Sequence, residues 1–328
     1  MKTVISLLIF IIPINVFGQT FTIKGCRTFV PKNQKVCLLE NGQTSKLILF
    51  RSNLQVNTDG IPISYHPYDL RGDSIALNTI LNGVAIYRKS DNVRISNPKE
   101  PNKFTDREKL EMRKKAYQVF EQWRDSGFDI VQPVGYKIIW ANVLIPRDGK
   151  PCIMTSGNYT GYFASATALK NGLTTDMGEC ECKNQVDPFV IPALVLAGKH
   201  PKYGNSPVTV YGAKVGDLLV AYNPKNKKLV YAIVGDTGPE KNLGEGSVIL
   251  NMKLTEKTKY PKTKKETYDL ATGEGIIICI IPQSNSYSRV TPYTQENIQE
   301  RIIKWFSEQH INGEQEIISL IEGSKSQL

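Results

Sequence analysis

The chain carries many short apolar segments, each bounded by glycine, proline or Asn-Gly. Residues 229–234 and 275–281 are the clearest, because aliphatic side chains dominate both and a glycine or a proline directly follows each. Such segments are typical of β-strands, and a long series of them with few helical patterns favours a compact β-barrel. The sequence therefore predicts a mainly β protein with peripheral α-helices. The other predicted strands lie at residues 21–23, 35–39, 46–50, 83–87, 136–145, 161–165, 188–196 and 217–222.

Two segments have helical patterns instead. Thr105 and Glu108 form a capping-box pattern in front of a helix that reaches about Asp125, and Gly127 ends it. Residues 294–309 form a second amphipathic pattern, whose apolar side chains recur at helical spacing. We expect both helices to pack against the β structure.

The amino terminus has the pattern of a secretory signal peptide. Lys2 precedes a short apolar run, which ends in small residues near Gly18 and is too short to span a bilayer. Cys26 lies too far downstream for a lipobox. We therefore expect a secreted or periplasmic protein without stable membrane insertion. The predicted units are a signal peptide at 1–18, a barrel domain at 19–287 with a helical insertion near 98–135, and a helical tail at 288–328.

Six cysteines in an exported chain predict disulfide bonds. Cys26 and Cys37 are close enough in sequence to close a short loop. Cys180 and Cys182 are too close to pair comfortably with each other, so Cys152 and Cys279 are attractive partners for them, although the sequence does not choose among the pairings. Zinc binding is the rival interpretation, but the three histidines lack ligand spacing, and we expect neither metal nor cofactor.

The formal net charge is +10, and the excess of basic residues lies in the amino-terminal half of the chain. A basic face could hold an anionic cell-wall polymer. A solvated surface with lysine-rich loops, such as residues 257–265, explains the same charge. No basic stripe interleaved with aromatic residues is present, so we expect no nucleic-acid partner. We also expect a monomeric protein.

Two acidic residues framed by glycines follow the strand pattern at 229–234. Gly235 ends that run and delivers Asp236 to a sheet edge, while Gly244 and Gly246 leave Glu245 without bulky neighbours. Paired carboxylic acids in an open groove are what hydrolysis of a glycosidic bond requires. The competing interpretation makes Asp236 a turn cap and Glu245 a surface loop residue.

Several motifs resemble glycoside hydrolase family 75, the fungal-type chitosanases. They occur in the family's order within residues 50–90 and 136–283, and as an ordered set they are fairly specific. The motifs are Asp59-Gly60 with Tyr65-His66-Pro67, the segments 161–169, 186–192 and 216–218, Gly235-Asp236-Thr237-Gly238-Pro239, and Gly244-Glu245-Gly246-Ser247. The chain departs from the family pattern in residues 19–50, in residues 98–135 and after residue 287.

The resemblance implies a function and a fold. It implies endo-hydrolysis of β-1,4-linked glucosamine polymers such as chitosan with inversion, and it carries the family's two essential acids onto Asp236 and Glu245. The Asp-Thr-Gly-Pro segment also resembles double-psi β-barrels, which occur in related glycosidases, lytic transglycosylases and expansins. By analogy it therefore implies a double-psi-like barrel.

Inversion needs a protonated acid and an ionised base, roughly 6.5–9.5 Å apart, with water between the base and the sugar. We assign Glu245 as the acid, because partial desolvation raises the pKa of a carboxyl group. Asp236 is then the base, kept ionised by backbone N–H groups of its turn. The resemblance mainly supports this split, and the reverse split is the alternative.

Other residues are candidate substrate contacts. Asp187 and Asp59 could each bind a substrate ammonium or act as turn residues. Tyr65 is a candidate sugar platform, and Phe163 either stacks on a sugar or packs in the core. We also expect Ser165 and Lys170 to lie in the cleft.

Two other functions use the same kind of fold. A peptidoglycan lytic transglycosylase would use one acid and no water, and the basic amino-terminal half suits an anionic wall polymer. An expansin-like module would bind the wall without forming any product.

Overall fold

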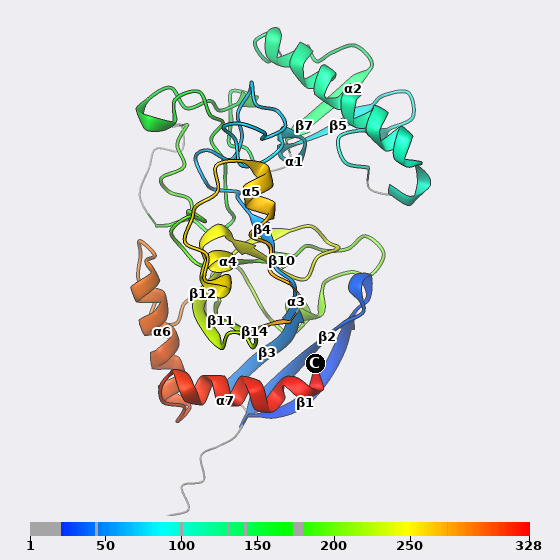
Figure 1. Cartoon of the computed structure of the whole chain (residues 1–328). Coiled ribbons are helices and arrows are strands. Elements are labelled where there is room, and N and C mark those ends of the chain that lie inside the picture. The colour runs from blue at the N-terminus through cyan, green and yellow to red at the C-terminus, as the bar shows by residue number, and fades with distance from the viewer. Residues whose placement is uncertain are drawn as a thin grey trace, which may run out of the picture.

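The computed structural model describes residues 21–42, 45–98, 101–129, 131–140, 143–172, 180–273 and 275–328. It confirms a mainly β protein with several helices, centred on a nine-stranded mixed sheet (Figure 1). The strands of this sheet are β1 (Thr22–Phe29), β2 (Gln34–Asn41), β3 (Ser45–Ser52), β4 (Gln55–Asn57), β10 (Ala193–Ala197), β11 (Leu218–Asn223), β12 (Lys228–Gly238), β13 (Glu245–Ser247) and β14 (Ile276–Ile281). Their order across the sheet is β1-β2-β3-β14-β11-β12-β10-β13-β4.

The predicted barrel does not close. Strands β1 and β4 are at the two ends of the sheet, and in the described part of the chain they do not pair with each other. Strand β10 runs parallel to β12, and β13 runs parallel to β4, while the other neighbouring pairs are antiparallel. The predicted apolar segments therefore form an open mixed sheet rather than a closed barrel.

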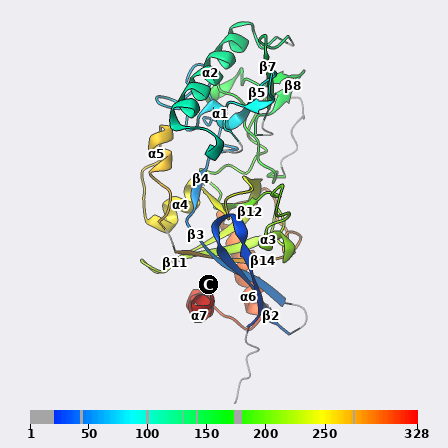
Figure 2. The same cartoon turned by 90° about the vertical axis from the view of Figure 1, so that its right-hand side faces the viewer.

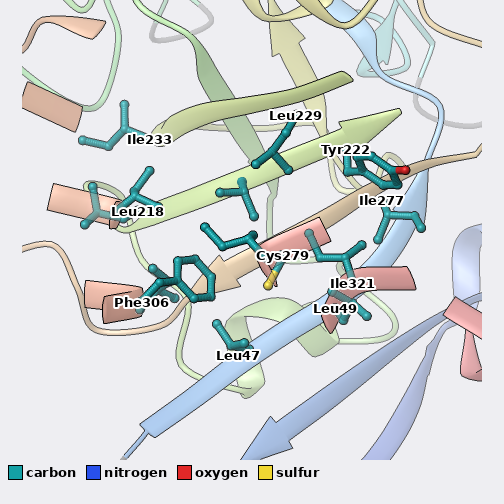
Figure 3. Packing of buried hydrophobic residues seen from close by; sticks show 14 of the residues in the cluster. Leu47, Leu49, Leu218, Tyr222, Leu229, Ile233, Ile277, Cys279, Phe306 and Ile321 are labelled. Atoms are coloured by element: carbon teal, nitrogen blue, oxygen red, sulfur yellow. The ribbon is translucent and has the colours of Figure 1, made fainter. Parts of the chain in front are cut away.

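The central strands are apolar because both faces of the sheet are covered. In β14, Ile277, Cys279 and Ile281 face one core, and the three alternate isoleucines face the other. Helices α6 (Gln295–Glu308) and α7 (Glu314–Ser324) pack on the first face. Helix α4 (Val248–Thr255) contributes to the core on the second face. The short helix α3 (Pro207–Val210), which follows β10 in the chain, contributes to the same core. Figure 3 shows the first core, with Phe306 and Ile321 from the helices beside the sheet residues.

A second unit lies at one end of the molecule, above the sheet in Figures 1 and 2. It contains a three-stranded antiparallel sheet with the order β6-β5-β7, covered by helix α2. Its elements are α1 (Ile80–Gly83), β5 (Val84–Arg88), β6 (Val93–Arg94), α2 (Asp106–Asp125) and β7 (Tyr136–Trp140). Helix α2 begins with the predicted capping box of Thr105 and Glu108, so this helix prediction is confirmed.

Other local predictions have mixed outcomes. Helix α6 confirms the amphipathic pattern at 294–309. The predicted strand at 161–165 is wrong, because Phe163 and Ser165 form only isolated bridges. The strand predicted at 136–145 ends at Trp140, and the hairpin of β8 (Pro146–Arg147) and β9 (Lys150–Pro151) follows. Helices α4, α5 (Lys264–Tyr268) and α7 were not predicted.

Two disulfides are present among the described residues. Cys26–Cys37 links β1 to β2, as predicted, and Cys152–Cys180 closes a second loop. The expectation that Cys279 takes part in a disulfide is wrong, because its side chain is buried in the sheet core. Cys182 is also a free, buried thiol.

The predicted signal peptide lies outside the described residues. Within the described ranges, no helix is long and apolar enough to cross a membrane.

Candidate active site

Asp236 and Glu245 lie in one row across the sheet. Asp236 of β12 pairs with Val195 of β10, and Val195 pairs on its other side with Glu245 of β13. Neighbouring strands are about 4.8 Å apart, so two spacings put the Cα atoms of the two acids roughly 10 Å apart. Side chains of directly paired residues leave the same face of a sheet. The two carboxyl groups therefore flank Val195 on one face.

A β-bulge at Gly235 produces this row. Leu194 pairs with Val234, but the next residue, Val195, pairs with Asp236, which leaves Gly235 as an extra residue in β12. Without the bulge, Asp236 would lie opposite Leu196, whose side chain is in the core. The expectation that Gly235 ends the strand is therefore wrong, because β12 continues to Gly238.

Backbone groups and a lysine surround the carboxyl group of Asp236. Burial raises its pKa, while N–H groups of Thr237 and Ala168 and the charge of Lys170 act in the opposite direction. The Thr237 N–H donates to Oδ1 over 2.7 Å. All three of these contacts favour the ionised form of Asp236.

Glu245 has fewer partners that favour ionisation. Glu245 is the first residue of strand β13. The competing interpretation, which made it a surface loop residue, is therefore wrong. Burial raises the pKa of Glu245, the charge of Asp236 raises it further, and the Asn242 side chain lowers it. The Asn242 amide is 3.4 Å from Oε1, which makes a weak hydrogen bond.

Asp59 brings a third carboxyl group to the same place. Burial raises its pKa to about 7, the Tyr65 hydroxyl acts against this rise, and the charges of Asp236 and Glu245 add to it. The Tyr65 hydroxyl donates to Oδ1 of Asp59 over 2.7 Å. Asp59 and Asp236 both lie in the wall of a cavity of about 10 Å³, together with Thr167 and Val195. This volume is about enough for one water molecule.

The segment that carries Asp59 is fixed by Gly60. The Gly60 N–H donates to Oγ of Ser165 over 3.0 Å. The φ angle of Gly60 is +98°, and a Cβ atom there would lie only 2.7 Å from Cγ2 of Thr167. Ser165 is fully buried. Ser165 therefore positions the Asp59 segment. Its hydroxyl is not accessible to a substrate, although the sequence had suggested that Ser165 lies in the cleft.

Two aromatic residues predicted to contact sugar are inaccessible. Phe163 is 0% exposed and packs with Phe120 and Phe128 in the core of the upper unit. Tyr65 is 1% exposed, so it cannot be a stacking platform, although its hydroxyl reaches Asp59. The spacing of apolar residues in the sequence did not show whether these two rings are buried or exposed.

Lys170 and Asp187 lie at the margin of the site. The Lys170 ammonium donates to the Thr167 carbonyl over 2.7 Å and to Oε1 of Gln185 over 2.6 Å. Asp187 accepts from the Phe189 N–H over 2.8 Å, the geometry of a turn residue, and it is not in the wall of the cavity. Binding of a substrate by either residue stays a prediction.

Sequence reasoning missed several residues around the acids. Tyr268 of α5 is near enough to Glu245 for the charge of that group to raise its pKa, although burial is the larger cause, and it is hydrogen-bonded to Asn82. Asn78 donates to the Tyr65 hydroxyl and to Oγ1 of Thr58, both over 3.1 Å. Asn78 lies in a loop and Asn82 in the short helix α1, and no local sequence pattern distinguished either of them.

The described part of the chain contains no group of three or more His, Cys, Asp or Glu side chains that could hold a metal ion. No protein-family model matches the chain, and no curated protein matches it. The geometry of the three carboxyl groups is therefore the basis for assigning a function.

Proposed function

We propose that this protein is a secreted endo-glycoside hydrolase that cleaves β-1,4 bonds of chitosan or a related glucosamine polymer with inversion. The observation that carries the proposal is the row in which Asp236 and Glu245 flank Val195. A Cα separation of roughly 10 Å, with both side chains on one face, leaves room for a sugar and a water between an acid and a base. In this proposal Glu245 is the general acid and Asp236 is the general base.

The surroundings of the two acids support this division. Asp236 has two backbone N–H groups and the Lys170 ammonium nearby, and all three stabilise a carboxylate. Glu245 has one long hydrogen bond and a negatively charged neighbour, so it holds a proton more readily. During the reaction Glu245 would give its proton to the leaving oxygen while Asp236 takes a proton from water.

The cavity beside Asp236 favours hydrolysis over a transglycosylase reaction. A lytic transglycosylase uses an attacking hydroxyl of the sugar itself, so it needs neither a second carboxylate nor a place for water. Here the cavity of about 10 Å³ is next to the proposed base and has the size of one water. An expansin-like module has no need of such a cavity either.

Charge and the family resemblance support a glucosamine polymer as the substrate. The protein has a net charge of +10, yet Asp59, Asp236 and Glu245 are gathered at one site. The ionised Asp236 at this site can attract an ammonium group while the rest of the surface is basic. The motifs shared with family 75 chitosanases include Asp236 and Glu245. The two disulfides and the signal-like residues 1–18 fit an exported enzyme.

The experiment is product analysis of the purified protein with chitosan, chitin oligomers and peptidoglycan in parallel. Mass spectrometry should find shortened glucosamine oligomers that carry the mass of one added water. Proton NMR of the first products should find the α-anomer, because inversion of a β bond gives α. Anhydro products from peptidoglycan would support the transglycosylase instead, and polymer binding without products would support the expansin-like module.

Matched variants test the residues. Asp236→Asn and Glu245→Gln should each lower the rate at least about a hundredfold, because each removes a proton-transfer group. The controls are Asp125→Asn and Glu111→Gln, two exposed acids on α2. They carry the same chemical changes away from the site and should leave the rate unchanged.

A further inference from the structure

Asp59 lies in the wall of the cavity together with Asp236, but the two-acid reaction does not use it. The cavity wall contains these two carboxyl groups, and its other side chains are uncharged. The charged and titratable groups that face Asp59 are Tyr65, Asp236 and Glu245. A water molecule in this cavity would therefore be close to both Asp59 and the proposed base.

A chain of hydrogen bonds fixes the carboxyl group of Asp59. Tyr65 donates to its Oδ1, and Asn78 in turn donates to the Tyr65 hydroxyl. The Asp59 N–H donates to Oδ1 of Asn57 over 2.7 Å, which fixes the backbone as well. One oxygen of Asp59 thus has a fixed donor, and no hydrogen bond occupies the other oxygen in the described part of the chain.

We propose that Asp59 is a positioning residue that stays protonated during the reaction and donates a hydrogen bond through the cavity water to the ionised Asp236. This role rests on the proposed hydrolase function. The water gives one proton to Asp236, and its oxygen bonds to the anomeric carbon. The glycosidic C–O bond breaks and Glu245 protonates the leaving oxygen, while Asp59 keeps its own proton.

Electrostatics agree with this geometry. Burial and the neighbouring charges of Asp236 and Glu245 raise the pKa of Asp59 to about 7, despite the opposing hydrogen bond from Tyr65. Asp59 is therefore neutral below pH 7, whereas Asp236 has Lys170 and two N–H groups beside it. Two carboxyl groups that share a small site avoid a double negative charge when one of them keeps a proton.

The first test compares two substitutions in the complete protein below pH 7. Asp59→Asn keeps a neutral side chain with an acceptor for Tyr65 and a donor for water, so its rate on chitosan should stay of the same order as that of the wild type. Asp59→Ala removes the donor that positions the water and should lower the rate about a hundredfold. An Asp59→Asn variant as inactive as Asp59→Ala would overturn the proposal, because it would mean that a negative charge is needed at this position. An Asp59→Ala variant of wild-type activity would overturn it too.

The second test does not depend on activity. Infrared spectra distinguish a protonated carboxyl group from a carboxylate, so a titration from pH 5 to pH 9 follows the proton directly. Because Glu245 is protonated as well, the titration uses Glu245→Gln as its background. We expect one carboxyl band to disappear near pH 7 in Glu245→Gln and in the double variant with Asp187→Asn, and to be missing in the double variant with Asp59→Asn. A spectrum without this band, or a band that persists in the double variant with Asp59→Asn, would overturn the proposal even if chitosan is cleaved. A band that behaves as expected would uphold the protonated state of Asp59 even if chitosan is not the substrate.

Discussion

Asp236 lies opposite Val195, and not opposite Leu196, because Gly235 is an extra residue in strand β12. The bulge changes the face from which the carboxyl group leaves the sheet. Up to Val234 the alternate residues of β12 point into the core that contains Leu194 and Leu196. A single inserted glycine therefore moves an acid out of the core pattern and into the row that ends in Glu245.

Gly238→Ala should disturb this row. A Cβ atom at Gly238 would lie 2.7 Å from Cγ1 of Val195 and 3.8 Å from Oε2 of Glu245. Val195 must then move, and with it the spacing of the two acids. We expect the free energy of unfolding to fall by about 1–3 kcal/mol, as in other overpacked sites. Urea denaturation measures the stability, and the rate on chitosan should fall more than the stability loss explains.

The matched control is Gly25→Ala in strand β1. A Cβ atom at Gly25 would have nothing within 4 Å. This variant should keep both the stability and the rate of the wild type. If Gly238→Ala behaves in the same way, Val195 does not set the spacing between Asp236 and Glu245.

Tyr65→Phe should change the titration of Asp59. The Tyr65 hydroxyl lowers the pKa of Asp59, so its removal should raise that pKa above about 7. We expect a stability loss of about 1 kcal/mol for one hydrogen bond and a clear loss of rate, because Asp59 is no longer held. The infrared titration and the rate on chitosan check the two effects.

Tyr222→Phe is a suitable comparison for that variant. The Tyr222 hydroxyl donates to Oε1 of Glu322 over 2.8 Å, so the same kind of bond is lost where helix α7 packs on the sheet. The rate should stay unchanged while the stability falls slightly. Equal rates for Tyr65→Phe and Tyr222→Phe would contradict a role of Tyr65 at the site.

Local sequence signals predicted the parts of the fold that depend on local interactions. Thr105 with Glu108 predicted α2, because a capping box lies within one helical turn. Helix α7 was not predicted because its N-cap is Gly313, which has no side chain that could cap the helix and mark its start in the sequence. Closure of the barrel depends on pairing between distant strands, and short apolar segments bounded by turns look the same in an open sheet that is covered on both faces.

The candidate site was predicted in part for the same reason. Asp236 and Glu245 were found because glycines frame them in sequence. The bulge at Gly235 was not predicted, because register is a property of two strands rather than of one. The sequence left Phe163 open between a sugar contact and the core, because an aromatic residue beside a motif can face either way. Its contacts with Phe120 and Phe128 join segments far apart in the chain.

Thiol counting should separate the free cysteines from the disulfides. Burial raises the pKa of Cys182 to about 11 and that of Cys279 to about 12, so both thiols are protonated and shielded at pH 8. A thiol reagent should therefore label no cysteine in the folded protein. It should label the two free cysteines after unfolding, and all six after unfolding with a reductant. Four labelled thiols in the unfolded, unreduced protein would contradict one of the two disulfides.

Asp69→Asn should destabilise the loop that leads to Asn78, and the effect should depend on pH. Burial alone would raise the pKa of Asp69, but N–H groups of residues 73–76 donate to its carboxylate and together lower the pKa to about 2. A lowered pKa means that this stabilisation is complete above about pH 4, the value of an unfolded aspartate, and is lost as pH falls through about 2. We expect Asp69→Asn to lower the free energy of unfolding by about 2 kcal/mol at pH 7.

Urea denaturation at several pH values should find that the difference in stability between the wild type and Asp69→Asn narrows below pH 4. Asp73→Asn, an exposed acid of the same loop, should have little effect, and a pH-independent loss in Asp69→Asn would mean that shape rather than charge holds the loop.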